Sequence, residues 1–176
     1  SYNNLAACLN TQGKAAEALP LFRQALEIRE KVLGKEHPAT AAGYSNLAVC
    51  LQSLGKRAEA FPLYRKALQI HEKALGKEHP STATSYNNVA TCLQDQGKAA
   101  EALPLYRKAL LIREKSLGRE HPHTVNNYNN VAACLLALGR PTEAVRLWQQ
   151  SLRGQEVARI LRAESGFERA QLTRGY

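Results

Sequence analysis

The sequence predicts an all-α solenoid, a stack of helix-turn-helix repeats, on three observations. A tyrosine-led segment occurs four times, with Tyr2, Tyr44, Tyr86 and Tyr128 placed 42 residues apart. A glycine recurs in step with it, and apolar residues between these markers follow the spacing of a helix face. A single helical pair of this size cannot bury both of its apolar faces, so neighbouring pairs must stack on one another.

Each period contains two helices. In the second copy we expect helix A over residues 38–54 and helix B over residues 57–75. A proline at the first helical position and a glycine just past the end are typical of such boundaries, and Pro38 and Gly55 occupy those places. The predicted core positions are Tyr44, Leu47, Ala48 and Leu51 on helix A, and Ala60, Leu63, Tyr64, Ala67, Leu68 and Ile70 on helix B.

The core pattern resembles that of the tetratricopeptide repeat family. The matching positions are Tyr44, Leu47, Ala48, Leu51, Ala60, Tyr64 and Ala67, with their counterparts in the other copies. The period of 42 residues and the Tyr-Asn-Asn-Val-Ala segment at 86–90 are similar to the variety found in kinesin light chains. The resemblance implies a right-handed superhelical solenoid whose A helices line a concave groove for extended peptides.

The repeats are expected to occupy residues 1–153. The predicted boundaries are a truncated first repeat at 1–37, then 38–79, 80–121 and 122–153. Residues 154–176 are expected to form a helical extension of the last helix B or a short cap, with a frayed end after Gly166. The chain has no Met and opens in mid-helix, so we expect it to be a piece of a longer protein.

Two ladders of reactive side chains have structural explanations. Members of each ladder share one repeat position, and packed helices lie about 8 to 10 Å apart, which is too far for a disulfide or a shared metal ion. We therefore expect free thiols that fill packing gaps, histidines that cap helices, and no metal site. Free thiols indicate a cytoplasmic location. The ladders are Cys8, Cys50, Cys92 and Cys134, and His37, His79 and His121.

Signatures of catalysis are absent from the sequence. It contains no Gly-rich phosphate loop and no helical His pair with an interposed acid. Asp95 is the only aspartate, no motif sets a nucleophile beside a base, and His71 and His123 have no evident partner. We expect no enzymatic activity and no cofactor.

The charge of the chain favours an acidic protein or peptide partner. Lys and Arg number 24 against 15 Asp and Glu, which gives a net charge of +9. Cations such as Arg65 and Arg107 lie on helix B, mostly away from the groove, so the acidic preference stays open. Nucleic acid is not expected, because few aromatic side chains remain for base stacking. A membrane partner is not expected either, since no apolar stretch approaches the roughly 18 residues of a span.

The face of helix A opposite the buried stripe carries amides, hydroxyls and small side chains. Asn offers a donor and an acceptor together, so successive repeats can hold the backbone of an extended peptide at regular intervals. For the ladder that contains Asn46, hydrogen bonding to a neighbouring helix is an equally good explanation. The predicted peptide-binding residues are Asn3, Asn4, Ser45, Asn46, Thr84, Asn87, Asn88, Thr91, Gln94, Asn126, Asn129 and Asn130.

The leading functional hypothesis is a protein-protein interaction module that binds an extended peptide segment of its partner in the concave groove, as an adaptor or scaffold. The alternative is a structural spacer, or an oligomerisation or regulatory arm of a larger sensor or scaffold protein, with partners on the helix B surface. Self-association through the exposed repeat ends also stays open.

Overall fold

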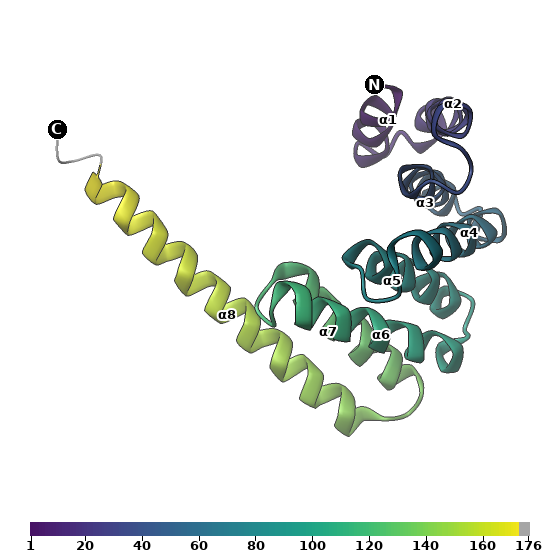
Figure 1. Ribbon diagram of the computed structural model, residues 1–176. Helices are drawn as coiled ribbons and strands as arrows, with labels where there is room; N and C mark the ends of the chain where they lie inside the picture. Colours follow the sequence, from purple (N-terminus) through teal and green to yellow (C-terminus); the bar gives the residue numbers. More distant parts are fainter. Residues whose placement is uncertain (173–176) are drawn as a thin grey trace. The chain divides into compact units, whose positions relative to one another are not determined.

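The computed structural model is helical throughout the residues that it describes (Figure 1). It describes the backbone of residues 1–172 and the side chains of residues 1–157, 159 and 160. The all-α prediction is confirmed, and the arrangement is that of a helical-repeat solenoid. The helices are α1 (Tyr2–Thr11), α2 (Ala15–Leu33), α3 (Pro38–Ser53), α4 (Arg57–Leu75), α5 (Pro80–Asp95), α6 (Ala99–Leu117), α7 (Pro122–Ala137) and α8 (Pro141–Leu172).

Histidine and proline begin the A helices α3, α5 and α7. The Nδ1 atoms of His37, His79 and His121 accept the backbone N–H of the residue two positions later, at 3.1, 3.1 and 3.2 Å. The first N–H groups of a helix have no partner within it, and the imidazole satisfies one of them. The predicted capping role of the histidine ladder is confirmed. At the other end of α3, Gly55 has a φ of 73°, the left-handed conformation expected after a helix.

The predicted stripe of α3 is the core of its repeat. Tyr44, Leu47 and Leu51 are 3%, 6% and 3% exposed. The Tyr44 hydroxyl donates to the carboxylate of Glu30 on α2, so the core tyrosine also ties adjacent repeats together. Burial, followed by the hydrogen bond to Glu30, raises the pKa of Tyr44, which keeps this donor protonated. The same pairing joins Tyr86 to Glu72 and Tyr128 to Glu114.

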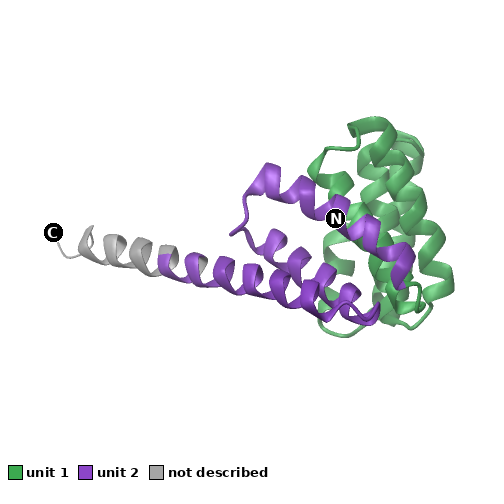
Figure 2. Cartoon of the chain, turned by 90° about the horizontal axis from the view of Figure 1, so that it is seen from below, with its two compact units in different colours: residues 1–98 green, residues 99–176 purple. Residues whose placement is uncertain are grey.

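The chain forms two compact units (Figure 2). The first, Ser1–Lys98, contains α1 to α5, and the second, Ala99–Tyr176, contains α6 to α8. Within each unit, helices that are consecutive in sequence pack against one another. The boundary between the units falls inside the predicted third repeat, between its helix A and its helix B, so the repeat boundaries stay a prediction.

Helix α8 runs without interruption through Gly154, which is the extension of the last helix B, one of the two alternatives that the sequence left open. Gly154 is buried, and a Cβ atom added to it would lie 2.9 Å from Val125 Cγ2 and 3.2 Å from the Arg119 carbonyl oxygen. The glycine therefore lets α8 approach α7 closely instead of ending the helix. Fraying was predicted after Gly166, but the backbone of residues 167–172 still belongs to α8, and residues 173–176 lie outside the described residues.

All four cysteines are free, as predicted, but only three of them fill the core. Cys50, Cys92 and Cys134 are fully buried. Cys50 Sγ lies 3.2 Å from the carbonyl oxygen of Ala15, the first residue of the preceding helix B, and Cys134 makes the same contact with Ala99. Cys8 is exposed, so the packing role predicted for it is wrong. Its position needs a preceding helix B for that contact, and the described residues contain none.

Candidate functional site

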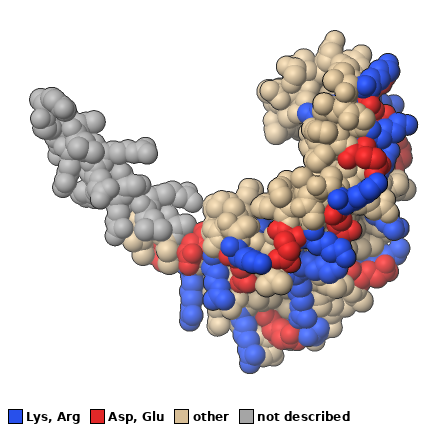
Figure 3. All heavy atoms as spheres, viewed as in Figure 1, with Lys and Arg blue, Asp and Glu red and all other residues tan. Residues whose placement is uncertain are grey.

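The A helices carry almost no charge. Helices α1, α3 and α7 contain no Asp, Glu, Lys or Arg, and α5 contains only Asp95. The charges of the repeats are therefore placed on the B helices and the loops. Figure 3 shows Lys and Arg gathered over α2 and α4, whereas the surface over α1 and α3 is largely free of charged residues. A ligand on the A-helix surface of the first unit meets uncharged groups.

Asp95 itself belongs to a polar network at the end of the A helices. Gln52 Nε2 donates to Asp95 Oδ2 at 2.8 Å and joins α3 to α5. The Tyr64 hydroxyl on α4 donates to Gln52 Oε1 at 3.0 Å, and Arg57 Nε lies 3.8 Å from the same carboxylate. Because three helices contribute to this network, we interpret it as a device that fixes their stacking.

A pocket of about 560 Å³, which we call the α3–α5 pocket, opens on the A-helix surface of the first unit. Four of the predicted peptide-binding residues line it: Ser45 and Asn46 on α3, and Thr84 and Asn88 on α5. The apolar side chains of the lining are small or branched. They belong to Pro38, Ala39, Ala42, Val49 and Leu75.

The Asn46 ladder is partly used for stacking. Asn46 Nδ2 donates to Asn3 Oδ1 at 2.9 Å and thereby joins α3 to α1. One repeat later the same two positions hold Asn88 and Ser45, and within the described residues neither of these side chains has a hydrogen-bond partner. The two polar groups that the ladder leaves unpaired therefore both line the α3–α5 pocket.

The other predicted binding residues lie outside this pocket. Asn4 and Asn126 are exposed, and Gln94 and Asn129 are half-buried. Asn87 and Asn130 are already engaged in interactions within the chain, and the Thr91 hydroxyl donates to the Asn87 carbonyl oxygen at 3.0 Å. The residues 126, 129 and 130 belong to the second unit. Of the predicted set, only Ser45, Asn46, Thr84 and Asn88 line this pocket.

His71 and Ser85 form a part of the pocket that the sequence analysis missed. His71, on α4, is 6% exposed, and Ser85, on α5, is 2% exposed. His71 Nδ1 lies 2.8 Å from Ser85 Oγ, and His71 Nε2 lies 3.3 Å from the Pro38 carbonyl oxygen. The expectations that His71 has no partner and that no nucleophile lies beside a base are both wrong. Residues from three helices meet there only after packing.

The equivalent positions in the other repeats hold different pairs. Arg29 donates to the Ala39 carbonyl oxygen at 3.2 Å, and its side chain lies where a Cβ on Gly43 would point. Arg113, 8% exposed, donates to Asn127 Oδ1 and to the His123 carbonyl oxygen. At this position the side chain that joins helix B to the next helix A by hydrogen bonds is an arginine in two repeats and a histidine in one.

Comparison with known families and structures agrees with this geometry. The tetratricopeptide repeat profile matches residues 1–73, 40–107 and 81–156. The chain belongs to the tetratricopeptide repeat family. No curated protein matches the chain. Tetratricopeptide repeats are protein-interaction modules, and their fold typically serves as a non-enzymatic scaffold.

Solved structures place this tetratricopeptide repeat protein near the kinesin light chain type, as its sequence suggested. A Podosopora anserina protein described as a kinesin light chain with nearly identical TPR-like repeats is 33% identical, with a TM-score of 0.80 over 89% of this chain and 74% of that chain. BtubC (BKLC) from P. vanneervenii is 22% identical, with a TM-score of 0.80 over 90% of this chain and 63% of its own. The apo form of RapI is 15% identical, with a TM-score of 0.79 over 94% and 58%. The last two show the fold alone.

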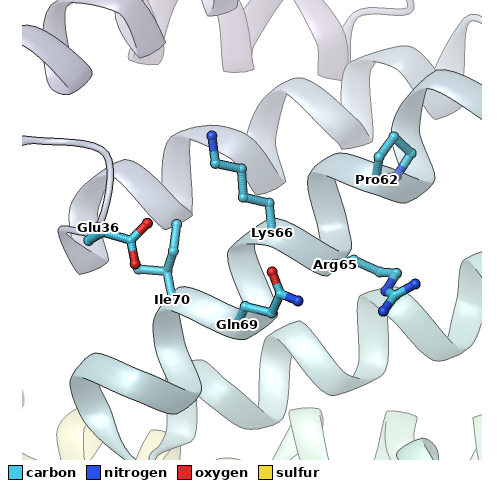
Figure 4. A pocket seen from close by; sticks show the side chains of 6 residues that line it. All are labelled: Glu36, Pro62, Arg65, Lys66, Gln69 and Ile70. Carbon is cyan, nitrogen blue, oxygen red and sulfur yellow. The ribbon is translucent and has the colours of Figure 1, made fainter.

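A second pocket of the tetratricopeptide repeat protein, which we call the outer pocket, lies on α4 (Figure 4). It has a volume of about 410 Å³ and is lined by Glu36, Pro62, Arg65, Lys66, Gln69 and Ile70. Lys66 is held by Tyr44, because its Nζ donates to the Tyr44 hydroxyl at 2.5 Å and lies 4.1 Å from the ring centroid. Arg65 points away from Lys66 in Figure 4, so the two cations do not converge on one point.

Among the residues that the structure describes, no three His, Cys, Asp or Glu side chains come together as metal ligands. In the same part of the chain, no helix combines the length and the hydrophobicity of a membrane span.

Proposed function

We propose that this protein is an adaptor or scaffold module that binds an extended peptide segment of a partner protein along its A helices, with the α3–α5 pocket as the main contact. The observation that carries the proposal is that the hydrogen bond between Asn46 and Asn3 is not repeated between Asn88 and Ser45. Ser45 and Asn88 line the pocket without hydrogen-bond partners, so their hydroxyl and amide are available to a ligand. Thr84 and Asn46 flank them.

The chemistry of the lining suits a peptide backbone. Asn88 has both donors and an acceptor, and Ser45 has one donor and two acceptor lone pairs, which match the alternating N–H and C=O groups of an extended chain. The remaining predicted contacts of the first unit extend this surface in the proposal: Asn3, Asn4, Asn87, Thr91 and Gln94. On α7, in the second unit, the proposed contacts are Asn126, Asn129 and Asn130. The similarity to a kinesin light chain repeat structure supports a protein partner.

The net charge of +9 has a separate role in this proposal. Because the cations are on B helices and loops, they attract an acidic partner over a distance and do not contact the bound segment. Salt then lowers the association rate more than it raises the dissociation rate. The four free cysteines support a reducing compartment such as the cytoplasm as the place where this occurs.

Titration of immobilised peptide libraries against the protein tests the proposal. Replacing Ser45→Ala and Asn88→Ala together removes about two hydrogen bonds of roughly 0.5 to 1.5 kcal/mol each, so affinity should fall by about 5- to 150-fold if the effects add. The matched control is Arg65→Ala with Gln69→Ala in the outer pocket of the same unit. Thermal melts of each variant exclude unfolding.

The outer pocket favours a second candidate, a structural or regulatory arm with its partner on the B helices. Its lining contains the apolar Pro62 and Ile70 as well as Arg65, which gives a partner both contact area and charge. If the control pair abolishes binding at all salt concentrations and the Ser45 and Asn88 pair has no effect, the groove proposal is wrong and this second function replaces it.

A further inference from the structure

The two hydrogen bonds of His71 fix which of its nitrogen atoms carries the proton. Nε2 faces the carbonyl oxygen of Pro38, which can only accept a hydrogen bond. Nε2 is therefore protonated in the neutral ring, and Nδ1 presents a lone pair. Since Nδ1 lies 2.8 Å from Ser85 Oγ, the Ser85 hydroxyl must be the donor of that bond. Neutral His71 thus binds the hydroxyl proton of Ser85.

Protonation of His71 reverses the second bond. In the imidazolium both nitrogens are donors, so Nδ1–H donates to Ser85 Oγ while Nε2–H still donates to Pro38. The Ser85 hydroxyl no longer donates to His71, so it can donate a hydrogen bond to another acceptor. Ser85 and His71 both line the α3–α5 pocket, so that acceptor can belong to a ligand. The same step places a positive charge in a lining that otherwise contains no charged side chain.

The groups around His71 determine its charge. Helix α3 contains no Asp, Glu, Lys, Arg or His, and His79, the N-cap residue of α5, lowers the pKa of His71. On its own helix, Glu72 is bonded to Tyr86, and Lys73 lies 3.5 Å from Glu36. Burial lowers the pKa of His71 and the Pro38 carbonyl partly offsets this effect. His71 is therefore neutral at neutral pH, and its pKa lies below the usual 6.5.

Among the residues whose side chains are described, this arrangement occurs in one repeat. The equivalent helix B residues, Arg29 and Arg113, are permanent cations. The positions equivalent to Ser85 hold Gly43 and Asn127, and neither has a hydroxyl that could donate a hydrogen bond to a ligand. Of these three positions, only the one that faces the α3–α5 pocket holds an imidazole, which can be either neutral or charged.

We propose that His71 and Ser85 make the α3–α5 pocket a proton-controlled site for a carboxylate of the bound peptide. Above the pKa of His71 the pocket offers uncharged amide and hydroxyl groups. Below it, the Ser85 hydroxyl donates to the ligand carboxylate and the imidazolium charge stabilises that bond. The inference rests on the proposed peptide-binding function and adds to it a ligand group and a mode of regulation.

The hydrogen-bond arrangement can be tested without any ligand. Long-range proton–nitrogen NMR correlations of the histidine rings should show His71 as the Nε2–H tautomer at about pH 8, with a single protonation step below about pH 6.5. In Ser85→Ala the midpoint of that step should move, because Nδ1 of neutral His71 no longer accepts a hydrogen bond from the Ser85 hydroxyl. A neutral ring with its proton on Nδ1 contradicts the inference whatever peptides bind.

Peptide pairs that differ only by Glu and Gln test the ligand group. Each member of the library used for the proposed function is made in both forms and titrated at about pH 5 and about pH 8, where Glu is ionised. We expect the Glu form to bind about 10- to 100-fold more tightly at the lower pH, the size of a hydrogen bond to a charged group, and the Gln form to change about twofold or less. In His71→Gln the Glu form should lose this dependence.

His121→Asn is the matched control, since it removes a histidine from the second unit and leaves a side chain that can cap α7. It should bind as wild type does at both pH values. Equal pH dependence of the Glu and Gln forms, or persistence of the dependence in His71→Gln, refutes the proton control and leaves the proposed function intact. Absence of peptide binding at either pH refutes the proposed function and this inference together.

Discussion

The amide of Asn46 donates to the amide oxygen of Asn3 at 2.9 Å, and one repeat later the same two positions hold Asn88 and Ser45, which no hydrogen bond joins. The serine side chain is one group shorter than asparagine, so it does not span the distance between α3 and α5. A single substitution in the repeat thus separates a stacking contact from a surface available for binding.

Restoring the ladder should strengthen the fold and weaken binding. In Ser45→Asn, the new amide oxygen can accept from Asn88 and add about 0.5 to 1.5 kcal/mol to the free energy of unfolding. Ser and Asn have similar helix propensities, so little is lost from α3. Urea unfolding and peptide titration measure the two effects. Ser45→Ala should weaken binding without the gain in stability, and a more stable variant that binds as wild type does contradicts the role given to Asn88.

Replacement of Gly154 by alanine should lower the stability of the protein, although such a change usually raises it inside a helix. A Gly→Ala change inside a helix normally stabilises it by about 1 kcal/mol. At this site the added Cβ would lie 2.9 Å from Val125 Cγ2 and 3.2 Å from a backbone oxygen, so Gly154→Ala should instead destabilise the protein by about 1 to 3 kcal/mol. Thermal or urea unfolding detects the sign.

Val125→Ala should rescue that variant. The equivalent A-helix positions in earlier repeats are Ala41 and Ala83, and the positions equivalent to Gly154 are Ile70 and Ile112. In the last repeat the larger side chain is therefore on helix A, whereas in the earlier repeats it is on helix B. The double variant should be more stable than Gly154→Ala alone. Equal stability of the two means that the backbone of the 119–120 loop, and not Val125, limits the space.

The sequence predicted the helices closely because proline and glycine mark their ends in every repeat. Helix α4 spans Arg57–Leu75 as predicted, and α3 ends at Ser53, one residue early. At Gly154 the same logic left two alternatives, a continued helix B or a short cap, and α8 shows the continued helix. A glycine inside a helix costs only about 1 kcal/mol, and close packing on Val125 gives this one a reason to be there.

The site was only partly predictable. The A-helix face of Ser45, Asn46, Thr84 and Asn88 follows from helical periodicity alone, and these residues do line one pocket. His71 was missed because its partners depend on how α4 packs on two other helices. The sequence did contain a signal for such contacts, because residues 14 apart meet across helices B and A, as Glu30 and Tyr44 do. The pairs at the position of His71 are Arg29 and Gly43, His71 and Ser85, and Arg113 and Asn127. These positions change together from repeat to repeat.

The thiols should differ in reactivity according to their burial. Cys8 is exposed, whereas burial raises the pKa of Cys50, Cys92 and Cys134 and keeps them in the unreactive thiol form. A thiol reagent should modify one cysteine per chain quickly under native conditions and all four in denaturant, as mass spectrometry can count. Cys8→Ser should abolish the fast phase. Fast modification of a second thiol in that variant means that a buried position opens readily.

Stability should fall in mild acid because of His71. Burial lowers its pKa in the folded state below the usual 6.5, so the unfolded chain binds the proton more readily. The stabilising contribution of neutral His71 is present above about pH 6.5 and is lost as the pH falls through the folded-state pKa, with a slope of up to about 1.4 kcal/mol per pH unit. Urea unfolding from about pH 8 to about pH 5 should show a shallower decline for His71→Gln than for wild type, since the capping histidines are common to both proteins. Parallel curves mean that His71 takes up its proton as easily in the folded chain as in the unfolded one, so that folding does not favour the neutral imidazole over the charged one.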